Sequence, residues 1–215
     1  MLYPLNTVTR TKISLNGIWK FAIQTPKLVN DVATPLDSEQ LMAVPASFND
    51  QTTDSKIRQH NGYFWYERSF NVPQVLLQEH LSLRFGSATH EAWVYVNGRE
   101  VGHHKGGFTP FELSIDDVIN AGKNRLTVKL SNLLDYTTLP VGNYSEDTDE
   151  NGNVVAHVDE NFDFFNYAGL HRNVDLLATP KNRIEDITIV PSVDVQNLRA
   201  DVSLQVKTTH DVGRI

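Results

Sequence analysis

Acidic side chains are closely spaced at one place where they could bind a metal ion. The segment Asp147-Thr148-Asp149-Glu150-Asn151-Gly152 has the spacing of the first half of a calcium-binding EF-hand loop. The twelfth position of such a loop is a glutamate that binds calcium through both oxygens, but this chain has Val158 there. A hairpin turn at Asn151-Gly152 explains these residues better, because Asn-Gly is the strongest short hairpin signal. We therefore expect no calcium site.

Histidines form the second set of candidates. His103 and His104 are adjacent, and neighbouring residues of a strand point to opposite faces, so both cannot easily bind one metal ion. We interpret His90 and His171 as hydrogen-bonded structural residues. The chain has no G-x-S-x-G elbow, no P-loop and no Rossmann fingerprint. These residues predict neither a metal site nor a cofactor.

Aromatic side chains are concentrated between Gly62 and Pro73, in the sequence Gly-Tyr-Phe-Trp-Tyr-Glu-Arg-Ser-Phe-Asn-Val-Pro. Such a group could form a platform on which a sugar ring stacks, with Tyr63 and Trp65 as its contacts. The interpretation that we favour is a strand whose alternate aromatic residues face a core between two sheets.

The elements that position these residues are predicted to be strands, in which apolar and polar residues alternate. The stretch Leu81–Ile115 contains apolar or alternating runs, and Asn97-Gly98 predicts a hairpin with a type I′ turn. Ile18–Ile23, Arg125–Leu130 and Val174–Ala178 read as further strands, whereas Leu133–Glu160 is the least regular part. Short strands separated by turn signals are typical of a β-sandwich or jelly roll.

Composition excludes several classes of protein. The 215 residues are 40% hydrophobic and 21% charged, which is enough for a packed core, and the net charge of −7 argues against nucleic-acid binding. There is no run of apolar residues long enough to span a membrane, and we expect no signal peptide at the N-terminus. Cysteine is absent, which fits a reducing compartment, and a cytoplasmic location is the default expectation.

Four motifs in the chain resemble one known family. They are Leu15-Asn-Gly-Ile-Trp-Lys-Phe21, Val44-Pro-Ala-Ser-Phe-Asn-Asp50, the run from Thr89-His90 through Asn97-Gly98 to Gly106-Gly-Phe-Thr-Pro-Phe-Glu112, and Asn161-Phe-Asp-Phe-Phe-Asn-Tyr-Ala-Gly-Leu-His-Arg172. Together they resemble the N-terminal sugar-binding domain of glycoside hydrolase family 2. Within that family the chain is most similar to the β-glucuronidases.

The resemblance implies an all-β fold with two parts. Residues 1–180 would form a jelly-roll β-sandwich of the galactose-binding type, which is the sugar-binding domain. Residues 181–215 would be the truncated start of an immunoglobulin-like β-sandwich, because a complete one needs about 100 residues. Its two alternating strands, Ile184–Val190 and Val202–Val206, should then leave an unpaired edge.

The resemblance also implies one site residue. In β-glucuronidases the aspartate that matches Asp163 lies on a loop that reaches into the substrate pocket and hydrogen-bonds a sugar hydroxyl. An ionised carboxylate only accepts hydrogen bonds and forms charge-assisted ones, so the role is chemically reasonable. The alternative is that Asp163 caps a turn between Phe162 and Phe164.

The same resemblance places the catalytic residues elsewhere. Retaining glycosidases use two carboxylates about 5 Å apart. In this family both are glutamates of a downstream (β/α)₈ barrel, and the acid/base glutamate follows an asparagine, yet this chain contains no Asn-Glu pair. We therefore expect the chain alone to be inactive and to serve a retaining β-glucuronidase that needs no cofactor. Alternatives are a stand-alone carbohydrate-binding module, a module for homo-oligomer assembly, or the same domain of a β-galactosidase-type relative.

Overall fold

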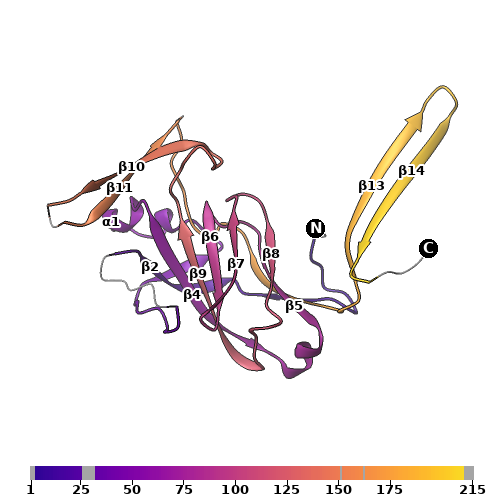
Figure 1. Cartoon of the computed structure of the whole chain (residues 1–215), viewed down its shortest axis with the longest axis horizontal. Helices are drawn as coiled ribbons and strands as arrows, with labels where there is room; N and C mark the ends of the chain where they lie inside the picture. The colour runs from indigo at the N-terminus through magenta and orange to yellow at the C-terminus, as the bar shows by residue number, and fades with distance from the viewer. Residues whose placement is uncertain (1–2, 26–31, 151, 162, 211–215) are drawn as a thin grey trace.

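Two antiparallel sheets pack face to face in the computed structural model, which describes residues 3–25, 32–150, 152–161 and 163–210 (Figure 1). The larger sheet has six strands, and the smaller has four. In spatial order the six are β3 (Leu41–Val44), β2 (Gly17–Ile23), β4 (Tyr63–Val72), β9 (Gly122–Ser131), β6 (Glu91–Val96) and β7 (Arg99–Lys105). The four are β1 (Thr11–Ser14), β12 (Val174–Thr179), β5 (His80–Phe85) and β8 (Phe111–Ser114).

The core lies between these sheets because successive side chains of each strand point to opposite faces of its sheet, so alternate residues face the other sheet. Phe64 and Tyr66 of β4 are fully buried, as are Leu83 and Phe85 of β5, and all four belong to one apolar cluster that spans both sheets. Burying a side chain of this size contributes about 1.5–3 kcal/mol. The prediction of an all-β sandwich is confirmed.

The aromatic run of β4 divides between the two faces of its sheet. Phe64 and Tyr66 point into the core, as the favoured interpretation predicts. Trp65 lies in a separate small cluster on the other face, and Tyr63 remains 37% exposed.

The hairpin predicted at Asn97-Gly98 is confirmed. Val96 pairs with Arg99, and the two residues between them have φ angles of 52° and 81°, as a type I′ turn requires. Asn97 also donates from Nδ2 to Val118 O at 2.9 Å, which ties the turn to the connection after β8.

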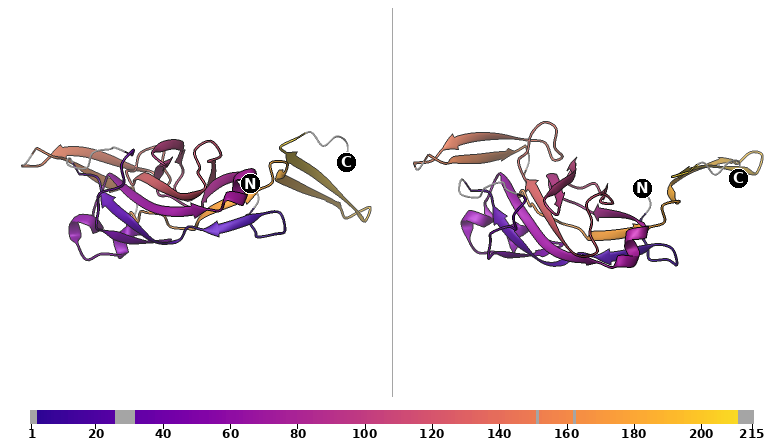
Figure 2. Two further views of the ribbon diagram at one scale, coloured as in Figure 1. Left: turned by 90° about the horizontal axis from the view of Figure 1, so that it is seen from below. Right: turned by 60° about the horizontal axis from the view of Figure 1, so that its bottom comes forward.

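Two hairpins extend from opposite ends of the sandwich (Figure 2). One consists of β10 (Gly142–Thr148) and β11 (Val154–Glu160), in the part of the chain that we expected to be the least regular. Strand β10 is polar and exposed after Gly142, and the residues of β11 are exposed or partly buried, so neither strand has a buried apolar face. The predicted turn falls between them, since Thr148 pairs with Val154, although Asn151 itself lies outside the described residues.

The second hairpin consists of β13 (Ile184–Asp194) and β14 (Arg199–Thr208). It contains the two strands expected after residue 180, and apolar side chains such as Ile189 and Leu204 are exposed on it. The division into domains at residue 180 stays a prediction. Short helices in the connections complete the fold: η1 (Phe48–Asp50), α1 (Ser55–Arg58) and η2 (Gln74–Gln78).

Candidate functional site

The segment that contains Asp163 is held by its buried side. Asn166, Ala168 and Leu170 are buried, with exposed fractions of at most 6%. Leu170 O accepts a hydrogen bond from Ala46 N, and Ala168 O accepts one from Phe48 N, each at 3.0 Å. The backbone of this segment therefore runs alongside the connection between β3 and η1.

Two further contacts fix the same segment. Gly169 N donates to Thr89 Oγ1 at 2.9 Å, and Gly169 O accepts from Thr89 N at 3.1 Å. Asn49 Oδ1 accepts from Ala168 N at 2.9 Å. Three of the motifs noted in the sequence, around Asn49, Thr89 and Gly169, thus meet at one place in the fold.

The opposite side of the segment faces solvent. Asp163 is exposed, and its carboxylate has no hydrogen bond or ion pair within the described part of the chain. Phe165 and Tyr167 are 44% and 41% exposed, and their ring centroids lie 4.7 Å apart. The alternative role of Asp163, as a cap between Phe162 and Phe164, involves Phe162, which lies outside the described residues.

This arrangement can bind a polyhydroxylated ligand. A free carboxylate accepts hydrogen bonds from hydroxyl groups, and exposed aromatic rings offer faces to an apolar surface. Arg58 lies 5.8 Å from the centroid of the Phe165 ring and adds a cation next to it.

Two histidines lie at the segment: His90, which is buried and contacts it, and His171, which belongs to it and is partly buried. His90 Nε2 is 2.8 Å from Asn166 Oδ1, and Asn166 Nδ2 donates to Asn132 O at 2.8 Å. Since the Asn166 amide presents its oxygen to His90, Nε2 is the protonated nitrogen of the neutral ring. Burial lowers the pKa of His90, and burial is also the main cause that lowers the pKa of His171. Both rings are therefore neutral near pH 7, and His90 helps to hold Asn166. The structural role of the two histidines stays a prediction.

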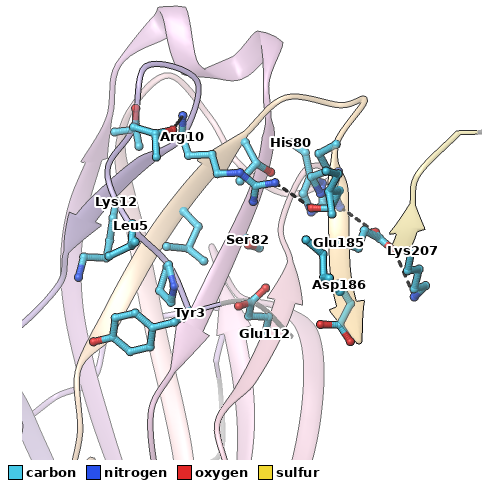
Figure 3. Close-up of a pocket in the computed structure, with 18 residues that line it drawn as sticks. Tyr3, Leu5, Arg10, Lys12, His80, Ser82, Glu112, Glu185, Asp186 and Lys207 are labelled. Carbon is cyan, nitrogen blue, oxygen red and sulfur yellow. Dashed lines mark hydrogen bonds and ion pairs between the residues drawn. The ribbon is translucent and has the colours of Figure 1, made fainter. Parts of the chain in front are cut away.

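A cavity of about 520 Å³ lies at the other end of the molecule, between the four-stranded sheet and the start of β13 (Figure 3). Several of its charged groups are held by hydrogen bonds or ion pairs. Arg10 Nη2 donates to Ile184 O at 2.8 Å, and Glu185 forms ion pairs with Arg183 at 3.2 Å and Lys207 at 3.1 Å. The Arg10 contact attaches the β13–β14 hairpin to the sandwich, and the two ion pairs of Glu185 lie within the hairpin and the residue before it, so we assign all three a structural role.

Neither a metal site nor a membrane span is found in the part of the chain that the structure describes. No group of three or more metal-binding side chains comes together there, and His103 instead contacts Glu91 at 2.7 Å. None of the described helices has the length and apolar character to cross a bilayer.

Comparison with known proteins gives a consistent result. Residues 13–180 match the family described as glycosyl hydrolases family 2, sugar binding domain. The β-glucuronidase of Streptococcus agalactiae serotype V is 46% identical over the whole chain, which covers 35% of that protein. The chain thus spans about a third of the length of this curated relative.

Solved structures of relatives have the same fold. A β-glucuronidase from an uncultured Clostridium species is 42% identical, with a TM-score of 0.86 over 98% of this chain and 36% of that protein. A β-glucuronidase from Ruminococcus gnavus in complex with D-glucuronic acid is 37% identical, with a TM-score of 0.87 and the same coverage.

Proposed function

Because the chain belongs to glycosyl hydrolase family 2 through its sugar-binding domain, we propose that it is the N-terminal part of a retaining β-glucuronidase. Residues 1–180 would form the sugar-binding domain, and residues 181–215 would begin the immunoglobulin-like domain. A cytoplasmic location is part of this proposal, and the absence of cysteine agrees with it.

The position of Asp163 is the observation that carries the proposal. Its carboxylate is exposed at the end of a segment whose other residues are fixed by hydrogen bonds to Ala46, Phe48 and Thr89. Because the nearby residues Ala168, Gly169 and Leu170 are fixed before a ligand binds, the segment loses less freedom on binding, which favours both affinity and orientation. We infer that Asp163 accepts a hydrogen bond from a hydroxyl of the glucuronide.

The two catalytic carboxylates would come from a separate barrel domain. In a retaining mechanism one attacks the sugar to form a covalent intermediate, while the other protonates the leaving group and later activates water. Asp163 would take neither role, because it would bind a hydroxyl that is not cleaved. If catalysis belongs to the barrel and hydroxyl binding to Asp163, two results are expected.

The isolated chain of 215 residues should not hydrolyse β-D-glucuronides. We expect no release of p-nitrophenol from p-nitrophenyl β-D-glucuronide above a buffer blank, because one positioned acceptor cannot replace a nucleophile and an acid. The Streptococcus agalactiae relative, assayed in parallel, is the positive control. Turnover by the purified chain would place a complete active site within it and overturn the proposal.

Removing the Asp163 carboxylate should weaken catalysis when a barrel is present. The suitable protein is a chimera in which residues 1–215 replace the matching third of the Streptococcus agalactiae relative. A hydrogen bond to a charged group contributes about 1.5–3 kcal/mol, so Asp163→Ala should lower kcat/KM roughly 10- to 100-fold.

Asp159→Ala is the matched control, since Asp159 is an exposed aspartate on the adjacent strand β11. It should leave kcat/KM within twofold of the unmodified chimera. Equal activity in the Asp163→Ala chimera, or a folded chimera that does not hydrolyse glucuronides, would contradict the proposal.

A further inference from the structure

A row of aromatic and basic side chains crosses the outer face of the six-stranded sheet. Trp65 of β4 pairs with Lys129 of β9, Lys129 pairs with Trp93 of β6, and Trp93 pairs with His103 of β7. Residues directly opposite in antiparallel strands point to the same face. These four side chains therefore form a line on the face that points away from the core.

The centre of this row is an ammonium group among three rings. Lys129 Nζ lies 4.1 Å from the ring centroid of Tyr63, 5.3 Å from that of Trp93 and 5.7 Å from that of Trp65. Such contacts stabilise a cation electrostatically. They do not use its three N–H donors, and within the described residues Lys129 has no hydrogen-bond acceptor.

One half of the row is covered and the other half is open. Trp65 is 4% exposed and packs with Ala22, Leu36 and Val32 beneath the loop before β3. Tyr63 is 37% exposed, and the side chain of His103 is 42% exposed. Trp93 is half-buried between them, so the open half presents aromatic surface next to the Lys129 donors.

The open rings form an angled surface. The Tyr63 and Trp93 centroids are 5.9 Å apart with an interplanar angle of 61°, and those of Trp93 and His103 are 4.9 Å apart at 36°. A ligand that lies flat on one ring is therefore bounded on its side by the next.

Polar groups border the aromatic surface. Glu91 Oε1 lies 2.7 Å from His103 Nε2, and Lys105 Nζ lies 2.9 Å from Asp135 Oδ2. Burial raises the pKa of Tyr63, and the negative charge of Glu91 adds to that rise. Aromatic faces, a cationic donor and a carboxylate acceptor are the groups that an amphipathic ring with hydroxyls requires.

We propose that the outer face around Tyr63, Trp93 and Lys129 is a second carbohydrate-binding surface, which binds a hexopyranose. The apolar face of the sugar ring lies against Trp93 and Tyr63, and Lys129 Nζ donates to an oxygen at its edge. That oxygen is a ring hydroxyl or the carboxylate of a uronic acid. The surface shares no residue with the segment 163–172 and needs no catalytic domain.

The test is a titration of the 215-residue chain, followed by tryptophan fluorescence. The chain has three tryptophans. Trp19 and Trp65 are 1% and 4% exposed, so a bound sugar should change the emission of Trp93. The probes are cellobiose, which is neutral, and methyl β-D-glucuronide, which carries a carboxylate. We expect saturable binding with a dissociation constant in the millimolar range.

Three substitutions test whether the fluorescence change and the binding arise from Trp93 and Lys129. Trp93→Phe should remove the fluorescence change but keep binding in a calorimetric titration, because a ring remains. Trp93→Ala should weaken binding at least tenfold. Lys129→Met should also weaken binding at least tenfold, because it keeps the length of the side chain and removes only the charge and the donors. Thermal melting of each variant verifies that it is folded.

Two controls separate this surface from other causes. Tyr136→Ala removes an aromatic ring that is 78% exposed elsewhere and should not change binding. This titration uses the 215-residue chain without a barrel, whereas the proposed function is tested by the kcat/KM of the chimera, so failure of this proposal and failure of the proposed function are distinguishable. Tighter binding of the glucuronide identifies a carboxylate as the partner of Lys129, and equal binding identifies a hydroxyl. The proposal is overturned if neither sugar binds saturably, or if the Trp93→Ala and Lys129→Met proteins bind as the parent does.

Discussion

Gly169→Ala should lower the free energy of unfolding by about 3 kcal/mol, because the structure leaves no space for a Cβ atom and the backbone conformation is unfavourable for an L-residue. Gly169 has a φ angle of 142°, a conformation that L-residues rarely adopt. A Cβ atom there would lie 2.8 Å from Ala46 O and 3.0 Å from the Tyr66 hydroxyl. The neighbouring carbonyl belongs to the backbone, so it cannot move without breaking the contacts that hold the segment.

Thermal and urea unfolding would measure this loss. For a domain of this size, about 3 kcal/mol corresponds to a fall in Tm of roughly 10 °C. Gly122→Ala is the control for backbone strain alone, since Gly122 has a φ of 78° but no atom within 4 Å of an added Cβ. It should cost about 1 kcal/mol. A Gly169→Ala protein that melts within 2 °C of the parent would show that the segment adapts freely.

The elements that the sequence predicts best are those defined by local spacing. Asn97-Gly98 predicts its hairpin because the turn depends on two adjacent residues. The strand between Gly62 and Pro73 is predicted by its composition and its terminal proline, and it spans Tyr63–Val72. The hairpin of β10 and β11 is less evident from the sequence, since β10 is polar and exposed and only the Asn-Gly pair marks the turn.

Contacts between distant segments explain what the sequence alone could not predict. The motifs around Asn49, Thr89 and Gly169 are far apart in the chain, and only the folded sandwich brings their hydrogen bonds together. Similarly, Trp93 and Lys129 lie on different strands, and their pairing depends on the register of β6 with β9. Register is set by the packing of whole sheets, so no local pattern reveals that three rings surround one cation.

The candidate site could be predicted only in part, because a local motif does not show which contacts distant segments make. The resemblance of residues 161–174 to a known family singles out Asp163, but it does not show which side chains face solvent. The structure adds Phe165 and Tyr167 on the exposed side and Asn166 on the buried side. Exposed and buried residues alternate from Phe165 to Ala168, and the two aromatic residues of this stretch are the exposed ones.

Asn166→Ala should also lower the free energy of unfolding by about 3 kcal/mol, because it leaves two buried polar groups without partners at about 1–3 kcal/mol each. Asn166 is 6% exposed and His90 is 2% exposed. The substitution removes the acceptor of His90 Nε2 and the donor to Asn132 O, both at 2.8 Å. The segment that carries Asp163 would lose its contact with Asn132, the residue directly after β9, so its amides should exchange hydrogen faster than those of β4.

Asn166→Asp keeps the size of the side chain and an acceptor next to His90, so it separates the contribution of this hydrogen bond from that of side-chain packing. In the parent protein burial holds the pKa of His90 below 6.5, so the unfolded chain binds more protons than the folded one and stability from this group falls as the pH drops below 6.5. A carboxylate next to Nε2 favours the protonated ring and raises the pKa of His90 above that of the parent. The Asn166→Asp protein should therefore gain stability relative to the parent as the pH falls from 7.5 to 5.5, whereas the Asn166→Ala protein should not. If urea titrations gave the same pH dependence for all three proteins, the contact between His90 and Asn166 would not be what holds this segment in place.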